Sequence, residues 1–237
     1  MTKEKCKPLK NYNNPKLLWR DDRIPIAQKF DDPYFSLDNG FEEVRHVFLN
    51  GNKLSNRLNN GFKIAELGFG TGLNFLSTLW LWRLKKQKGK IFYTSFEAFP
   101  LQPIEMLKAQ NEFPELSDLK DEFYSLWSTL LEKGELSGND YNLRLILGDA
   151  RRTIKQFDTL VDCWFLDGFS PAKNPELWEE DLLKNVYRCT ADGGTLSTYS
   201  AAGYVRRNLS LAGFQVERIS GFGRKRHMTI ALKNDEK

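Results

Sequence analysis

Glycines and acidic residues that follow apolar, strand-like segments are the part of this 237-residue chain best suited to chemistry. Three alternating glycines, Gly68, Gly70 and Gly72, come after Glu66 and before an apolar stretch of helical length, 73–82. Glycine adopts positive φ angles and lets a ligand approach the bare backbone. The first amides of a following helix point into the same space. The sequence therefore predicts a strand, a tight turn and a helix N-terminus that together bind a ligand.

The spacing of these glycines narrows the class of ligand. A dinucleotide fingerprint would need a third glycine where the chain has Leu73 or Phe75, and the Gly-Lys-Ser/Thr tripeptide of a P-loop does not occur. The pattern acid-x-Gly-x-Gly-x-Gly resembles the first motif of class I S-adenosyl-L-methionine (SAM) methyltransferases, in which the glycine turn faces the amino-acid end of SAM. A turn without a ligand is the weaker alternative, because three such glycines cost chain entropy without a gain in packing.

The elements around this turn predict an α/β fold. The expected strands are 62–67, 91–98, 141–147, 161–166, 195–199, 214–219 and 228–232. The expected helices are 41–49, 53–58, 73–86, 100–109, 177–189 and 202–211. Alternating strands and helices, with middle strands that are apolar throughout, favour a mostly parallel sheet covered on both faces. We expect the class I SAM methyltransferase (Rossmann-like) order, with the last two strands forming an antiparallel hairpin at one edge.

The length suits one ordinary domain with additions. We expect an N-terminal arm and extension over residues 1–60, flexible over 1–16, and a methyltransferase core over 61–237. Residues 111–140 exceed what a crossover needs and predict an inserted helical cap.

Composition points to a reduced, cytoplasmic protein. The chain has no membrane-length apolar run and no apolar signal-peptide region. Cys6, Cys163 and Cys189 form no C-x-x-C pair, and only two histidines are present, so we expect neither a disulfide nor a metal site. The net charge is +4; residues 1–30 carry +5, residues 201–237 carry +5, and the middle carries −6. These basic ends fit a polyanion-binding surface and a solvated tail equally well.

Four polar motifs fall at the carboxyl ends of successive strands, where open α/β sheets bind ligands. They are the glycine turn and the acids Glu97, Asp149 and Asp167. A carboxylate after the second strand suits the two hydroxyls of a ribose. Asp149 with Ala150 resembles the adenine-contacting turn of SAM methyltransferases, although a role as a helix N-cap explains Asp149 nearly as well. The coincidence of all four favours SAM binding.

Five longer stretches resemble one family: the methyltransferase domain of the bacterial tRNA wobble-uridine enzyme that makes 5-methylaminomethyl-2-thiouridine. They are Asp32–Gly40, Glu66–Phe75, Trp164–Pro175, Tyr199–Arg207 and Gly221–Arg226, and the resemblance runs from about Trp19 to Leu232. It implies methyl transfer from SAM to the exocyclic amine of 5-aminomethyl-2-thiouridine in the tRNA anticodon stem-loop, with Asp167 in the catalytic role.

The resemblance also implies residues for both ligands. We expect the cofactor at Glu66, Gly68, Phe69, Gly70, Thr71, Gly72, Asn74, Glu97, Asp149 and Ala150. We expect the substrate at Phe35, Asp38, Phe169, Lys173, Ser200, Arg206, Arg224, Lys225 and Arg226. Many members of the family carry a C-terminal FAD-dependent oxidase domain, which this chain lacks, so we expect the oxidase to be a separated domain or a separate protein.

Elementary acid–base chemistry shapes the expected role of Asp167. A lysine-like ammonium has a pKa near 10.4, so at pH 7 only about one amine in a thousand or fewer is neutral, which adds roughly 4–5 kcal/mol to the barrier. An ordinary carboxylate is a weak base against an ammonium and favours its charged form. We therefore expect Asp167 mainly to bind and align the amine for in-line attack, with water completing proton removal.

Two other functions compete with tRNA methylation. One is a methyl- or aminopropyltransferase for a free polyamine, which predicts an acid-rich pocket. The other is a binding module with a degenerate SAM fold, against which the intact acid, glycines and Asp167 argue.

Overall fold

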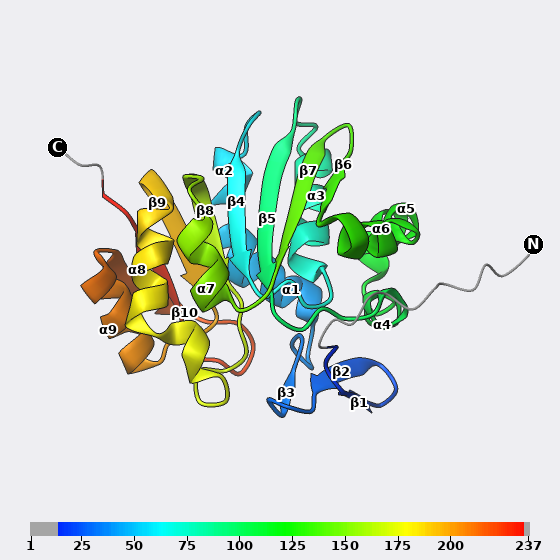
Figure 1. Ribbon diagram of the computed structural model, residues 1–237, viewed down its shortest axis with the longest axis horizontal. Coiled ribbons are helices and arrows are strands. Elements are labelled where there is room, and N and C mark those ends of the chain that lie inside the picture. Colours follow the sequence, from blue (N-terminus) through cyan, green and yellow to red (C-terminus); the bar gives the residue numbers. More distant parts are fainter. Residues whose placement is uncertain (1–13, 235–237) are drawn as a thin grey trace, which may run out of the picture.

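The computed structural model describes residues 14–234, so most of the arm expected to be flexible, and Cys6, lie outside the described part. An eight-stranded sheet in the order β10-β11-β9-β8-β4-β5-β7-β6 forms its centre (Figure 1). Its strands are β4 (Lys63–Leu67), β5 (Ile91–Glu97), β6 (Glu135–Ser137), β7 (Tyr141–Leu147), β8 (Val161–Leu166), β9 (Thr190–Thr198), β10 (Gln215–Ser220) and β11 (His227–Leu232).

Pairing within this sheet confirms the α/β, mostly parallel prediction. Strands β9, β8, β4, β5 and β7 run parallel to one another. The expected antiparallel hairpin is present: β10 is the edge strand, and β11 lies between β10 and β9, antiparallel to both. The short strand β6 was not expected; it pairs antiparallel with β7 at the opposite edge.

Helices cover both faces of the sheet and enclose two apolar clusters (Figure 1). One face carries α1 (Gly40–Val44), η1 (Arg45–Asn50), α2 (Leu54–Arg57), α3 (Leu73–Leu84), α4 (Pro103–Gln110), η2 (Pro114–Leu116), α5 (Ser117–Phe123) and α6 (Leu126–Lys133). The other carries α7 (Ala150–Thr153), η3 (Ile154–Gln156), η4 (Pro175–Trp178), α8 (Glu180–Arg188) and α9 (Gly203–Ala212). Along β8, Phe165 enters the first cluster and Trp164 the second, which explains why that strand is apolar on both faces from Cys163 to Leu166.

Two expected helices are built differently from the prediction. The segment 41–49 is α-helical only to Val44 and continues as the π-helix η1. It leads into Gly51, where a Cβ atom would lie 2.1 Å from the Val47 carbonyl oxygen, so only glycine fits. The expected helix 177–189 begins at Glu180, because Glu179 is extended and separates it from the 3₁₀ turn η4.

A second, three-stranded sheet precedes the core and was also not expected. It consists of β1 (Leu17–Arg20), β2 (Ile24–Ala27) and β3 (Asp32–Pro33) and lies beside the carboxyl ends of the central strands (Figure 1). Asp21 and Asp22 both have positive φ, which matches the tight turns that join two-stranded hairpins.

No helix within residues 14–234 has the length and apolar character of a bilayer span.

Residues 111–140, the predicted insertion, pack into the core beneath the glycine turn. Trp127 on α6 is fully buried, and its ring meets Phe69 edge-on with centroids 5.8 Å apart. A Cβ atom at Gly72 would lie 3.3 Å from the Trp127 ring. The insertion therefore supports the turn from below.

Removing this support should destabilise the protein. Trp127→Ala is expected to lower the free energy of unfolding by about 3–5 kcal/mol, because it leaves a large cavity in the core. Tyr124→Ala, at an exposed ring on the same insertion, should change it by no more than about 0.5 kcal/mol. Chemical denaturation of both variants measures the difference, and equal effects would contradict a supporting role for the insertion.

Candidate functional site

A cavity of about 790 Å³ opens at the carboxyl ends of the central strands. Its walls come from the glycine turn and from the segments that follow β5, β7 and β8. The N-terminal segment 29–44 and the loop between β10 and β11 complete it. This volume falls in the range of small-molecule sites in proteins.

The glycine turn adopts the backbone that its sequence predicts. Gly68, Gly70 and Gly72 have φ angles of 93°, 53° and 76°, which side chains disfavour. A Cβ atom at Gly68 would lie 2.8 Å from the Asp167 carbonyl oxygen, and one at Gly70 would lie 3.1 Å from the Tyr34 ring. The turn therefore needs glycine for its conformation and for close approach on both sides.

Glu97 ties the end of β5 to this turn. Its carboxylate accepts hydrogen bonds from the backbone N–H groups of Gly70 at 2.9 Å and Phe99 at 2.7 Å. Burial raises the pKa of Glu97, and the backbone N–H groups oppose that rise. The carboxylate lines the cavity with lone pairs left for a ligand.

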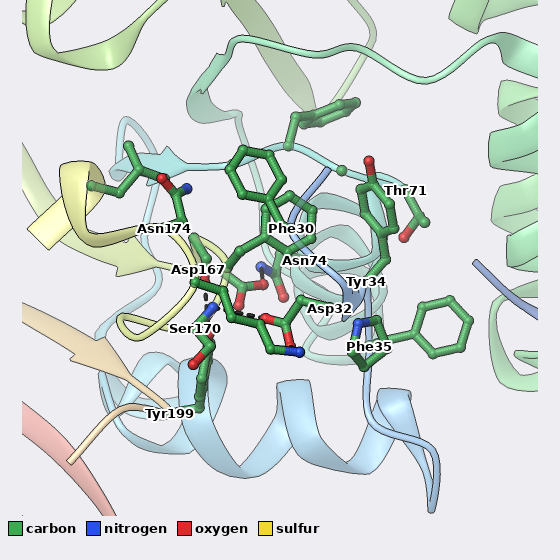
Figure 2. Close-up of a pocket in the computed structure, with 18 of the residues that line it drawn as sticks. Phe30, Asp32, Tyr34, Phe35, Thr71, Asn74, Asp167, Ser170, Asn174 and Tyr199 are labelled. Atoms are coloured by element: carbon green, nitrogen blue, oxygen red, sulfur yellow. Dashed lines mark hydrogen bonds and ion pairs between the residues drawn. The ribbon is translucent and has the colours of Figure 1, made fainter. Parts of the chain in front are cut away.

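One amide joins two carboxyl groups at the centre of the site. Nδ2 of Asn74, in the first turn of α3, donates to Oδ2 of Asp167 at 2.7 Å (Figure 2). The same nitrogen donates to Oε1 of Glu66, also at 2.7 Å. Asn74 and Asp167 line the cavity, whereas Glu66 is completely buried below them. Burial raises the pKa of Glu66 to about 8.

Asp167 has a perturbed carboxyl group. Burial raises its pKa to about 7. The hydrogen bond from Asn74 and the ammonium of Lys225 lower this pKa, while the carboxylates of Glu43 and Asp32 raise it. Asp167 therefore titrates near neutral pH, unlike the ordinary carboxylate that the sequence suggested.

Lys225 enters the cavity from the loop between β10 and β11. Its ammonium lies 2.8 Å from Oε1 of Glu43 and 4.0 Å from the centre of the Tyr199 ring. The Tyr199 hydroxyl donates to the Gly168 carbonyl at 2.7 Å, which fixes the ring beside Asp167. The cavity thus brings the Lys225 ammonium close to the carboxylates of Glu43 and Asp167.

Asp149 has a local role in this structure. It is the N-cap of α7 and accepts a hydrogen bond from the Arg151 backbone N–H at 3.0 Å. The Arg151 guanidinium binds the same carboxylate at 2.6 Å and lowers its pKa. The capping alternative for Asp149 is therefore present, and Ala150 lines the cavity next to it.

An aromatic cluster closes one side of the cavity (Figure 2). Phe30 stacks on Phe169 with centroids 4.7 Å apart, and Tyr34 meets Phe169 edge-on at 5.2 Å. Phe30 also meets Phe99 edge-on at 5.8 Å, so its ring spans the segments after β5 and β8. Two rings of this cluster, Phe30 and Tyr34, come from the N-terminal segment 30–34, which we call the roof.

Polar contacts hold the roof in place. Asp32 accepts a hydrogen bond from the Ser170 backbone N–H at 2.7 Å. The Lys173 ammonium contacts Asp31 and lies 3.8 Å from the Asp32 carboxylate. The roof is thereby attached to the loop that follows Asp167.

The structure brings most residues expected from the sequence to this one cavity. Those that line it are Phe35, Asp38, Gly68, Phe69, Gly70, Thr71, Asn74, Glu97, Asp149, Ala150, Asp167, Phe169, Lys173, Arg224 and Lys225. Those that do not are Glu66, Gly72, Ser200, Arg206 and Arg226. Ser200 is buried and its hydroxyl accepts from the Ala202 N–H, and the Arg206 guanidinium contacts the Ala201 carbonyl. Both contacts are local to the start of α9.

Sequence reasoning missed several lining residues. Phe30, Asp32, Glu43, Phe99 and Tyr199 all line the cavity. Glu43 occupies a helical position that reads as surface, and its role depends on a lysine 182 residues later. Phe99 lies two residues after Glu97, the acid that ends β5, and this position was the one sequence signal that pointed to it.

Comparison with known proteins identifies the family. Residues 111–234 match the S-adenosyl-L-methionine-dependent methyltransferase family. The tRNA 5-methylaminomethyl-2-thiouridine biosynthesis bifunctional protein MnmC of Leptospira interrogans is 42% identical over 227 residues, which cover 92% of this chain and 35% of that protein. The MnmC protein of a Marinomonas strain is 40% identical over 93% of this chain and 34% of its own length. The chain therefore spans about a third of the length of these curated relatives.

Solved structures agree with this assignment. The crystal structure of MNMC2 from Aquifex aeolicus is 26% identical, covers 96% of this chain and 74% of its own, and superposes with a TM-score of 0.75. Spermidine synthase from Thermotoga maritima, at 11% identity and a TM-score of 0.51, shares the fold alone. The family match over more than half of the chain, together with the glycine turn and the cavity, shows that this chain belongs to the S-adenosyl-L-methionine-dependent methyltransferases.

Proposed function

We propose that this chain transfers a methyl group from SAM to the exocyclic amine of 5-aminomethyl-2-thiouridine at the tRNA wobble position, giving 5-methylaminomethyl-2-thiouridine. The observation that carries the proposal is Asp167, held by Asn74 at 2.7 Å beside the glycine turn. A carboxylate at that place can receive a cationic amine next to the methyl donor. The names of the MnmC relatives support the choice of acceptor.

The cavity fits SAM by the chemistry of its donors and acceptors. The glycine turn would hold the amino-acid end, since its bare backbone lines the cavity. Glu97 would accept hydrogen bonds from the ribose hydroxyls. The Gly148–Ala150 turn would border the adenine, because the Asp149 side chain is already engaged by Arg151. When bound, SAM supplies an electrophilic methyl group on a sulfonium that leaves as a neutral thioether.

The raised pKa of Asp167 gives it a larger part in proton transfer than its sequence implied. Transfer from a lysine-like ammonium, with a pKa near 10.4, to a carboxylate of pKa about 7 is uphill by roughly 3 units, or about 4–5 kcal/mol. For an ordinary aspartate the cost is about 9 kcal/mol. Asp167 would accept one proton from the ammonium, and the freed lone pair would then form the new N–C bond.

The tRNA would approach across the basic loop between β10 and β11. Arg224 and Lys225 line the cavity mouth, and the Arg224 side chain is 93% exposed. Phosphate contacts from such residues position a nucleic acid without reading its sequence. Arg206 and Arg226 lie outside the cavity, where they are placed to contact phosphates rather than the modified base.

The relatives are named bifunctional and are about three times as long as this chain. We propose that their second activity resides in the part that this chain does not align with. It would be the FAD-dependent oxidase that supplies the aminomethyl group on which the methyl transfer acts.

The direct test is transfer of a labelled methyl group from SAM to tRNA that lacks only the final methyl. Wild-type protein should label the wobble nucleoside, and Asp167→Asn should lower kcat by about 10²–10⁴-fold, the usual range for a positioned acid or base. Asp158→Asn, at an exposed aspartate away from the cavity, is the matched control. Label in a free polyamine but not in tRNA would contradict the proposed acceptor, and full activity of Asp167→Asn would contradict the assigned site.

The pH dependence of kcat/KM provides a second test. Below pH 7 the Asp167 carboxyl is protonated and can neither attract the ammonium nor take its proton, so kcat/KM should rise with pH through an apparent pKa near 7. Asp167→Asn should lose this limb while retaining the rise caused by the amine itself at higher pH. A profile with the same limb in both proteins would assign it to another group.

A further inference from the structure

Glu66 ends β4 just before the glycine turn, yet it does not reach the cofactor cavity. Its exposure is 0%, and it is absent from the cavity lining. Oε1 of its carboxyl group accepts a hydrogen bond from Nδ2 of Asn74 at 2.7 Å, and the buried hydroxyls of Ser95 and Tyr93 are its other hydrogen-bonding neighbours. Its buried position therefore argues against the direct contact with SAM that the sequence suggested for Glu66.

Asn74 connects this buried acid to the reactive carboxylate. Its Nδ2 carries two hydrogens, one for Glu66 and one for Oδ2 of Asp167, the second also at 2.7 Å. Both partners accept hydrogen bonds, so together they fix the amide with its nitrogen toward the carboxyl groups. An amide that lacked the partner on the Glu66 side could turn its oxygen toward Asp167, which would repel that carboxylate.

Backbone contacts already fix the glycine turn and the main chain of Asp167 beside each other. Strands β4 and β8 are paired with Leu67 opposite Leu166, and the Asp167 N–H donates to the Leu67 carbonyl at 3.2 Å. Gly68 packs against the Asp167 carbonyl with no room for a Cβ atom. The side-chain torsions of Asp167 are what remains free, and Asn74 is the hydrogen-bond donor that sets them.

We propose that Glu66 is a positioning residue for methyl transfer: through Asn74 it fixes Oδ2 of Asp167 and leaves Oδ1 as the oxygen that receives the acceptor amine. This inference rests on the proposed function. It assigns Glu66 a role through the acceptor side of the site instead of the cofactor side.

Because Glu66 is buried, a role as the hydrogen-bond acceptor of Asn74 can be told apart from a role as a charged ligand of SAM. With its pKa raised to about 8, Glu66 is largely neutral at pH 7, and Oε1 serves Asn74 as a neutral acceptor. A glutamine presents the same acceptor at the same place. A residue that bound the α-ammonium group of SAM would instead require the negative charge, which glutamine lacks.

The experiment compares Glu66→Gln with Glu66→Leu in the full chain. Glu66→Leu should lower kcat on tRNA by about 10–100-fold, the loss expected when a reacting group is displaced by about 1 Å. The Kd for SAM, measured by calorimetry without tRNA, should change by less than about threefold. Glu66→Gln should restore kcat to within about threefold of wild type, because Asn74 keeps its acceptor.

A matched control and a second variant keep the test decisive. Ser77→Ala removes a buried hydroxyl on the same helix that has no hydrogen-bond partner within residues 14–234, and it should leave kcat and the SAM Kd unchanged. Should Glu66→Leu not fold, Glu66→Met takes its place. The Gln variant also decides alone: SAM binding weakened tenfold or more in Glu66→Gln would overturn the proposal and make Glu66 a cofactor ligand.

Crystal structures of the variants separate this inference from the proposed function. The Asn74 Nδ2 to Asp167 Oδ2 distance should stay near 2.7 Å in Glu66→Gln and be lost in Glu66→Leu. If wild-type protein methylates no tRNA, the proposed function fails, but this distance still tests the positioning. If Glu66→Leu keeps both the distance and wild-type kcat, the positioning role is excluded while the proposed function stands.

Discussion

The parallel pairing of β4 with β8 is the constraint on which the site depends. It places the residue after Leu67 beside the residue after Leu166, so the glycine turn and Asp167 leave the sheet side by side. The Asp167 N–H to Leu67 carbonyl bond continues the ladder one step past the strands. Because Gly68 has no side chain, the two backbones remain in contact where donor and acceptor chemistry must meet.

Around this junction the protein uses burial to change the chemistry of ordinary side chains. Glu66 and Asp167 are both acids, yet burial moves both pKa values toward neutrality, to about 8 and about 7. Burial disfavours the charged form of an acid, and the shared amide of Asn74 offsets part of that cost. A carboxyl group that titrates near pH 7 can take up and release a proton in the physiological range, which an exposed aspartate cannot do.

The sequence predicted the sheet and the meeting of the glycine turn, Glu97 and Asp167 at one cavity, because these depend on local patterns. Glycine spacing, apolar strands and acids at strand ends each act within a few residues of one another. The roof was missed because its residues are joined to the site only by tertiary contacts: Asp32 with Ser170, and Phe30 with Phe169. The raised pKa of Asp167 was missed for the same reason, since it results mainly from burial in the folded protein, with Glu43 and Asp32 raising it further from distant parts of the chain.

The roof can be varied separately from the β4–β8 junction when protein engineering aims at methylation of other acceptor amines. The β4–β8 junction tolerates little change, since a Cβ atom at Gly68 would meet the backbone of Asp167 at 2.8 Å. Phe30 and Tyr34, by contrast, come from the N-terminal segment and meet Phe169 through their side chains, while Lys173 reaches Asp32 from the loop after Asp167. Variant libraries at these positions would change the shape of the cavity wall while leaving the junction of Gly68 and Asp167 unchanged. The fold therefore separates a part of the site that must stay constant from a part that can be altered to select other acceptors.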